Sequence, residues 1–148
     1  MSARTSIGVM AVLLTAAPAF AQQPAPAGRV KVVTGQAFIV RASDVIAAQP
    51  GQLVFESDSL RTGEGTIGVT LKDDTRVSLG PASEVRLDRF SYGSADGSLA
   101  LVLKVVRGVT AYVSGRIAKL APDAVRLETP AAIVGVRGTT LAVRVTAD

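Results

Sequence analysis

Apolar and polar residues alternate along most of the chain in short stretches, a pattern typical of half-buried β-strands. The clearest stretches share a Val-x-Leu pair, in which both apolar side chains lie on one face of a strand. This pair recurs every eight residues, at Val69–Leu71, Val77–Leu79 and Val85–Leu87. Such a unit leaves about four residues for a strand and about four for a turn. The repeat therefore predicts either a meander or successive edges of a β-solenoid whose units bury a shared core.

Further short apolar or alternating stretches are separated by turn residues, and they predict additional strands. They cover residues 29–32, 36–40, 99–106, 109–113, 124–128, 131–136 and 140–145. The stretch 99–106 is nearly continuously apolar and is a candidate central strand. One short helix is expected around residues 116–121, because Pro122 would end it. The predicted fold is all-β, with about ten short strands in a solenoid-like or meander arrangement.

The N-terminal residues predict an exported protein. Arg4 precedes an apolar run over residues 7–17, and Ala19-Phe20-Ala21 has the small-residue pattern of a signal peptidase site. The alternative is an uncleaved anchor, but the run is shorter than the roughly 20 residues that a membrane-spanning helix needs. We therefore expect a signal peptide over residues 1–21, a flexible Pro- and Ala-rich leader over 22–28 and one β domain over 29–148. The processed protein is expected in the periplasm, without a membrane span.

The composition excludes most familiar catalytic chemistry. The 148 residues are 48% hydrophobic and include no His and no Cys. These absences exclude a Ser-His-Asp triad, a thiol nucleophile, imidazole or thiolate zinc sites and structural disulfides. The carboxylates of Asp73 and Asp74 stand where the repeat needs a turn, which is a structural use of Asp. We expect no enzymatic activity, no metal and no cofactor.

The charge pattern does not indicate nucleic acid as a partner. The formal net charge is +4, but the basic residues are spread singly along alternating strands. No block of basic residues and no ladder of Arg and aromatic residues is present, as nucleic-acid grooves require. A solvated strand face is the better interpretation of these charges.

An ordered series of motifs resembles the FecR-type periplasmic domain. The series begins with Asp58-Ser59-Leu60-Arg61-Thr62-Gly63, continues through the Val-x-Leu region and ends with Val136-Arg137-Gly138-Thr139. The resemblance spans nearly all of the chain after the leader. The residues that it marks as a structural or interaction motif are Asp58, Thr62, Gly63, Asp74, Gly108, Thr129, Pro130, Arg137, Gly138 and Thr139.

This resemblance implies a twisted, solenoid-like all-β fold and a role in envelope signalling. Full-length relatives of this type pass the state of an outer-membrane receptor to a cytoplasmic sigma factor. The chain shows neither a cytoplasmic sigma-binding region nor an internal transmembrane helix, so we expect the extracytoplasmic module alone, exported as a free protein. That expectation favours a binding or scaffold role over direct regulation of a sigma factor.

Two functional hypotheses from different classes follow. The first is a periplasmic protein-interaction module that binds an envelope protein by adding the partner's strand to an exposed sheet edge. The second is a structural protein that associates with itself through unpaired strands. The identity of the envelope partner is not specified by the sequence.

Arg137 is a lone charged residue beside an apolar run. It follows the apolar run 131–136 and precedes Gly138, so we expect it to be at least partly buried and paired. The resemblance makes Asp58 the first candidate acceptor, followed by Asp73 or Asp74, with backbone carbonyls as the alternative. The competing hypothesis makes Arg137 an exposed contact for a partner protein.

Overall fold

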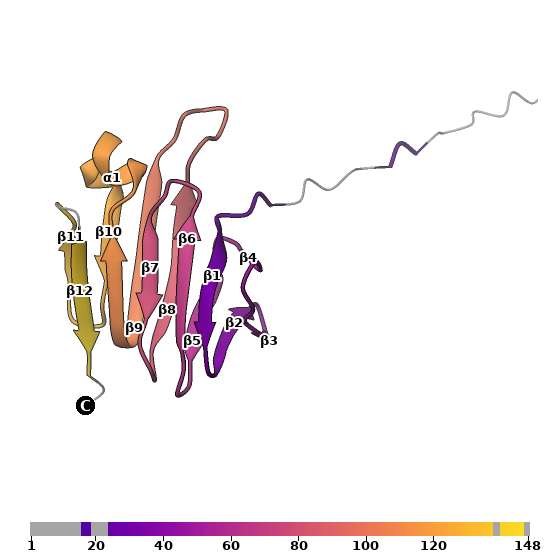
Figure 1. Cartoon of the computed structure of the whole chain (residues 1–148). Helices are drawn as coiled ribbons and strands as arrows, with labels where there is room; N and C mark the ends of the chain where they lie inside the picture. The colour runs from indigo at the N-terminus through magenta and orange to yellow at the C-terminus, as the bar shows by residue number, and fades with distance from the viewer. Residues whose placement is uncertain (1–15, 19–23, 138–139, 147–148) are drawn as a thin grey trace, which may run out of the picture.

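Twelve strands curl into one sheet in the computed structural model, which describes residues 16–18, 24–137 and 140–146 (Figure 1). The strands are β1 (Gly28–Thr34), β2 (Ala37–Arg41), β3 (Asp44–Ala47), β4 (Leu53–Val54), β5 (Ser59–Thr62), β6 (Thr66–Leu71), β7 (Arg76–Leu79), β8 (Glu84–Ser91), β9 (Ala100–Val113), β10 (Val125–Glu128), β11 (Ile133–Gly135) and β12 (Thr140–Val145). The helix α1 (Arg116–Leu120) and the 3-10 turn η1 (Pro122–Ala124) lie between β9 and β10. The prediction of an all-β chain is confirmed.

The long strand β9 joins two halves of the sheet. Its first half pairs with β8 on one edge and with β10 on the other, and beyond these lie β5, β2, β3 and β11. Its second half pairs with β7 and β12, and beyond β7 lie β6, β1 and β4. The neighbours change at Gly108, whose φ is +81°. β9 continues through this glycine without a break, so the two stretches predicted at 99–106 and 109–113 belong to one strand of 14 residues.

The three Val-x-Leu pairs all face the core, as their alternation predicts. Each of their six side chains is at most 4% exposed. Together with Val54, Leu60 and Leu103 they pack around the same interior, so both halves of the sheet share one core.

The structure does not confirm a solenoid-like arrangement of the repeat. The first two units pair as β6 and β7, but β7 and β8 both pair with β9 instead of with each other. The eight-residue units therefore do not stack in sequence, and the strands form a half-barrel in which β9 separates the second unit from the third. Alternation specifies which face of a strand is buried, but not which strand lies beside it.

The short helix is found where the sequence predicts it, and Pro122 opens the turn that follows. α1 lies at one end of the sheet, beside the upper ends of the central strands (Figure 1). At the N-terminus, β1 begins at Gly28, and Ala27 is already buried, with its N–H 2.7 Å from the carbonyl of Val54. The predicted signal peptidase site lies outside the described residues.

Candidate functional site

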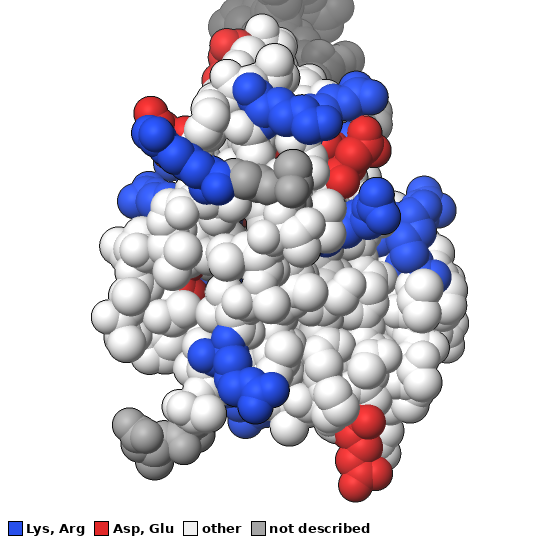
Figure 2. All heavy atoms as spheres, turned by 60° about the vertical axis from the view of Figure 1, so that its left-hand side comes forward, with Lys and Arg blue, Asp and Glu red and all other residues white. Residues whose placement is uncertain are grey.

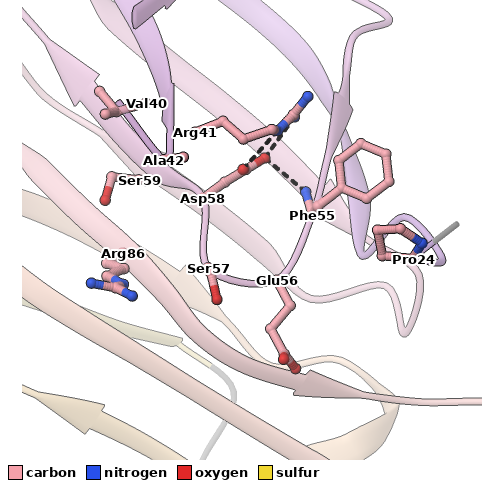
Figure 3. Close-up of a pocket in the computed structure, with 10 residues that line it drawn as sticks. All are labelled: Pro24, Val40, Arg41, Ala42, Phe55, Glu56, Ser57, Asp58, Ser59 and Arg86. Carbon is pink, nitrogen blue, oxygen red and sulfur yellow. Dashed lines mark hydrogen bonds and ion pairs between the residues drawn. The ribbon is translucent and has the colours of Figure 1, made fainter. Parts of the chain in front are cut away.

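Asp58 is the buried centre of a polar clamp at the end of β2. Its carboxylate, in a side chain only 1% exposed, accepts two hydrogen bonds from Arg41: Nε to Oδ1 at 2.9 Å and Nη2 to Oδ2 at 2.8 Å. The backbone N–H of Phe55 donates to Oδ2 at 2.9 Å, and the Arg41 guanidinium lies 4.6 Å from the centre of the Phe55 ring. The hydrogen bond to Asp58 is the main cause of a raised pKa for Arg41. The clamp ties the loop before β5 to β2 (Figure 3).

A pocket of about 590 Å³ opens beside this clamp, lined by residues of β2, β5, β8 and the loop before β5 (Figure 3). Its charged groups are already engaged within the fold. Asp58 is bound by Arg41, Glu56 accepts the N–H of Phe90 at 2.9 Å, and Arg86 lies 2.9 Å from Asp88. The Asp58 carboxylate therefore uses both of its oxygens in contacts that hold the loop before β5 in place. The described part of the chain does not bring together three potential metal ligands.

The prediction that Arg137 is at least partly buried was wrong. Its side chain is exposed, because β11 ends at Gly135 and the next inward-facing residue is Val136, at 5% exposure. The apolar run in the sequence therefore does not continue as a strand through Arg137. Its first candidate acceptor, Asp58, is bound instead by Arg41, an arginine that the motif does not include.

The other two candidate acceptors of Arg137 also have other partners. Asp74 adopts a φ of +68° in the turn between β6 and β7, and its exposed carboxylate lies 3.3 Å from Arg116. Asp73 is fully buried and holds the start of α1, since its Oδ2 accepts the N–H of Ile117 at 3.2 Å and the hydroxyl of Thr75 at 2.7 Å. The sequence correctly predicted that both carboxylates lie in a turn. It did not predict the contact of Asp73 with α1, because this contact joins residues 44 positions apart and no nearby residue indicates it.

Asp73 lies near a second buried polar side chain, Tyr112, and together they predict a pH dependence. Burial raises the pKa of the Tyr112 phenol above its usual value of 10.0, and the charge of Asp73 acts in the same direction. The folded protein therefore holds this proton more tightly than the unfolded chain does. The contribution of this proton to the free energy of unfolding should be fully present below pH 10 and should be lost as the pH rises beyond it. Thermal unfolding between pH 8 and about 11.5 should show this loss.

The Tyr112→Phe variant is the control for that prediction. It cannot lose a proton at this position, so its melting temperature should fall less steeply above pH 10 than that of the wild type. Equal slopes for the two proteins would contradict a role for Tyr112 in the alkaline transition.

Thr62 and Gly108, two residues of the family-like motif, have a structural role. The Thr62 hydroxyl donates to the carbonyl of Gly80 at 2.6 Å and accepts the N–H of Ser83 at 2.9 Å. The Ser83 hydroxyl in turn accepts the N–H of Val109 at 2.8 Å. A Cβ at Gly108 would overlap the side chain and the Cα of Ser83. These contacts join β5, β9 and the loop before β8.

The remaining motif residues that the structure describes lie in turns. The N–H of Gly63 donates to the carbonyl of Gln36 at 3.0 Å. Thr129 shapes the turn between β10 and β11, where its hydroxyl oxygen accepts the N–H of Ala132 at 3.0 Å, and the exposed Pro130 follows it. Gly138 and Thr139 lie outside the described residues. The motif therefore consists mainly of residues that hold the sheet together, and it does not converge on one pocket.

β12 has an open edge in the described part of the chain. Four strands of the described residues pair on one side only. Three of them are short: β3 has four residues, β11 three and β4 two. β12 has six residues and pairs on one side with β9. Within the described part of the chain, no strand pairs with its other side. An unpaired strand of this length is a template for another strand.

The hydrogen bonds of β9 show which backbone groups of β12 are unpaired. Val109 directs both of its backbone groups away from β12, because its carbonyl accepts the N–H of Gly80 at 3.0 Å and its N–H donates to Ser83. Successive residues of a strand direct their backbone groups to opposite edges. Thr110 and Tyr112 therefore direct theirs toward β12.

The register then assigns each residue of β12 to one edge. Val143 lies opposite Thr110, and Leu141 lies opposite Tyr112, so these two residues face β9 with their backbone groups. Thr140, Ala142 and Arg144 alternate with them and present their N–H and C=O groups to the open edge. The side chains of these three residues are exposed.

Comparison with known families supports the motif interpretation. A family model described as FecR protein matches residues 58–148, from the Asp58 clamp through β12. Searches of curated proteins and of solved structures found no match. No described helix is long and apolar enough to cross a membrane.

Proposed function

Because the chain belongs to the FecR protein family, we propose that it is a non-catalytic protein-interaction module of the periplasm that binds an envelope protein along the edge of β12. The family is connected with signalling at the bacterial envelope, which agrees with a binding role. The partner would add an extended segment to the sheet as a further strand, so that its backbone groups satisfy those of β12.

The single observation that carries this proposal is the unpaired edge of β12. Thr140, Ala142 and Arg144 present backbone donors and acceptors there, and the half-buried side chains of Leu141 and Val143 lie between them. By contrast, the charged groups that line the pocket beside Asp58 already have partners within the fold. The edge offers unsatisfied polar groups and apolar surface together, which is what strand addition uses.

A second candidate is self-association through the same edge. Two copies of β12 could pair antiparallel about Ala142, which would place Arg144 of one copy opposite Thr140 of the other. Such pairing would make the protein a structural component that forms dimers without a foreign partner.

A proline at Ala142 tests the proposed edge directly. Ala142→Pro removes an N–H that faces the open edge and leaves the hydrogen bonds to β9 intact, a position at which strands tolerate proline. We expect this variant to fold with a melting temperature close to that of the wild type. When an envelope fraction is passed over the immobilised protein, we expect it to lose the wild-type partner.

Ala142→Ser is the matched control, because it changes the side chain at the same position but keeps the N–H. It should capture the same partner as the wild type. Capture that is unchanged by the proline would show that binding does not use the β12 edge.

Light scattering on the purified wild type tests the second candidate, since a dimer that the proline variant loses would favour self-association.

A further inference from the structure

The charges of this protein are distributed unevenly between its two parts. Residues 100–148, which contain the strands around the open edge, carry seven Lys or Arg and three Asp or Glu, a net charge of +4. Residues 22–99 carry eight Lys or Arg and nine Asp or Glu, a net charge of −1. Within residues 22–148, the net positive charge therefore lies in the part that forms β9 to β12.

Two of these cations lie on β12 or next to it. Arg144 is an exposed residue of the open edge, and Arg137 is exposed shortly before the strand begins. No described Asp or Glu forms an ion pair with either of them, whereas Arg107 and Arg116 of the same part have Glu84 and Asp74 as partners. In the view that brings β11 and β12 forward, a broad uncharged area lies between basic and acidic side chains above it and further basic and acidic side chains below it (Figure 2).

The inner face of β12 sets a second requirement on a partner. Leu141, Val143 and Val145 pack against the core but remain partly exposed, because no strand of the described residues covers them on the open side. In a strand added to this edge, alternate side chains would lie beside these three residues. The other side chains of that strand would lie beside Thr140, Ala142 and Arg144.

We propose that the segment bound at β12 is acidic, with apolar residues alternating with Asp or Glu. This inference rests on the proposed function, because it specifies the partner of the same edge. The apolar residues cover Leu141 and Val143, and a carboxylate lies opposite Arg144. Opposite charges across a strand pair are favourable and like charges are unfavourable. A second copy of the chain would place the uncharged Thr140 opposite Arg144 and would add cations to this edge, so the charge favours an acidic partner over self-association.

Two synthetic peptides that differ only in charge test the inference on the whole exported protein. The peptides TVEVEVT and TVKVKVT have equal length and the same apolar positions. We expect the Glu peptide to bind about tenfold more tightly at low salt, by fluorescence anisotropy, and to weaken as salt rises. Arg144→Glu should shift the preference toward the Lys peptide, and Arg144→Gln should reduce the preference without reversing it. Thermal unfolding of both variants shows whether the fold is kept.

The outcomes separate this inference from the proposed function. Equal binding of both peptides, or a preference that Arg144→Glu does not change, would overturn an acidic partner. If Ala142→Pro nevertheless lost the binding of these peptides, strand addition at β12 would stand. If neither peptide bound, or if the proline left binding unchanged, the edge itself would be excluded as the docking site. A dimer of the wild type that excludes both peptides would overturn both proposals.

Discussion

Gly108→Ala is expected to destabilise the fold by about 2 to 5 kcal/mol. Gly108 has a φ of +81°, a conformation that costs an alanine roughly 1 to 2 kcal/mol. Its added Cβ would also overlap Ser83, whose backbone as well as its side chain is in the way. Relief of that overlap would displace the Ser83 hydroxyl from the N–H of Val109. Urea unfolding followed by circular dichroism measures the loss.

Gly97→Ala separates the two causes. Gly97 has a φ of +71°, and a Cβ there would meet no atom within 4 Å. This variant should therefore lose only the conformational part, about 1 to 2 kcal/mol. If both variants lost the same free energy of unfolding, the close approach of Ser83 to β9 would have no energetic importance.

Asp58→Ala is expected to cost about 2 to 4 kcal/mol. Removing one partner of a buried ion pair typically costs about 3 to 5 kcal/mol. The Arg41 side chain is 40% exposed, so solvent can compensate part of the loss. The variant also leaves the N–H of Phe55 without its acceptor and releases the loop before β5. The measurement is again the free energy of unfolding in urea.

Arg137→Ala is the informative comparison for Asp58→Ala. The family resemblance made Asp58 the first of several candidate partners for Arg137, and if the two residues formed one pair, both substitutions would be strongly destabilising. Because Arg137 is exposed and Asp58 is bound to Arg41, we expect Arg137→Ala to change stability by no more than about 0.5 kcal/mol. A similar loss in both variants would contradict the pairing seen in the structure.

The alternation of residue types predicted local features well. It identified the buried faces of β6, β7 and β8, because successive side chains of a strand point to opposite sides whatever the strand pairs with. It also placed α1, since Pro122 limits a helix through its own covalent geometry. Each of these features depends on residues that are close together in the chain.

The sequence did not predict the contacts between residues that lie far apart in the chain. Nothing near Arg137 in the sequence shows that β11 ends at Gly135, and nothing near Asp58 indicates Arg41, which lies 17 positions earlier. The Asp73 carboxylate likewise holds the start of α1 across 44 positions. Many charged and polar residues in the chain could have formed such pairs, and only the folded geometry brings particular atoms within hydrogen-bond distance.

The sequence by itself determined that the chain is all-β, which face of its Val-x-Leu strands is buried and that its motifs resemble those of the FecR family, because these properties follow from periodicity and residue type. Only the tertiary structure decided that β9 lies between β7 and β8, that Arg41 holds Asp58 and that β12 leaves an edge open. The physical reason is that backbone hydrogen bonds are the same for every residue, so a strand pattern carries little information about its neighbour. The neighbour is selected by packing of the whole sheet around its shared core.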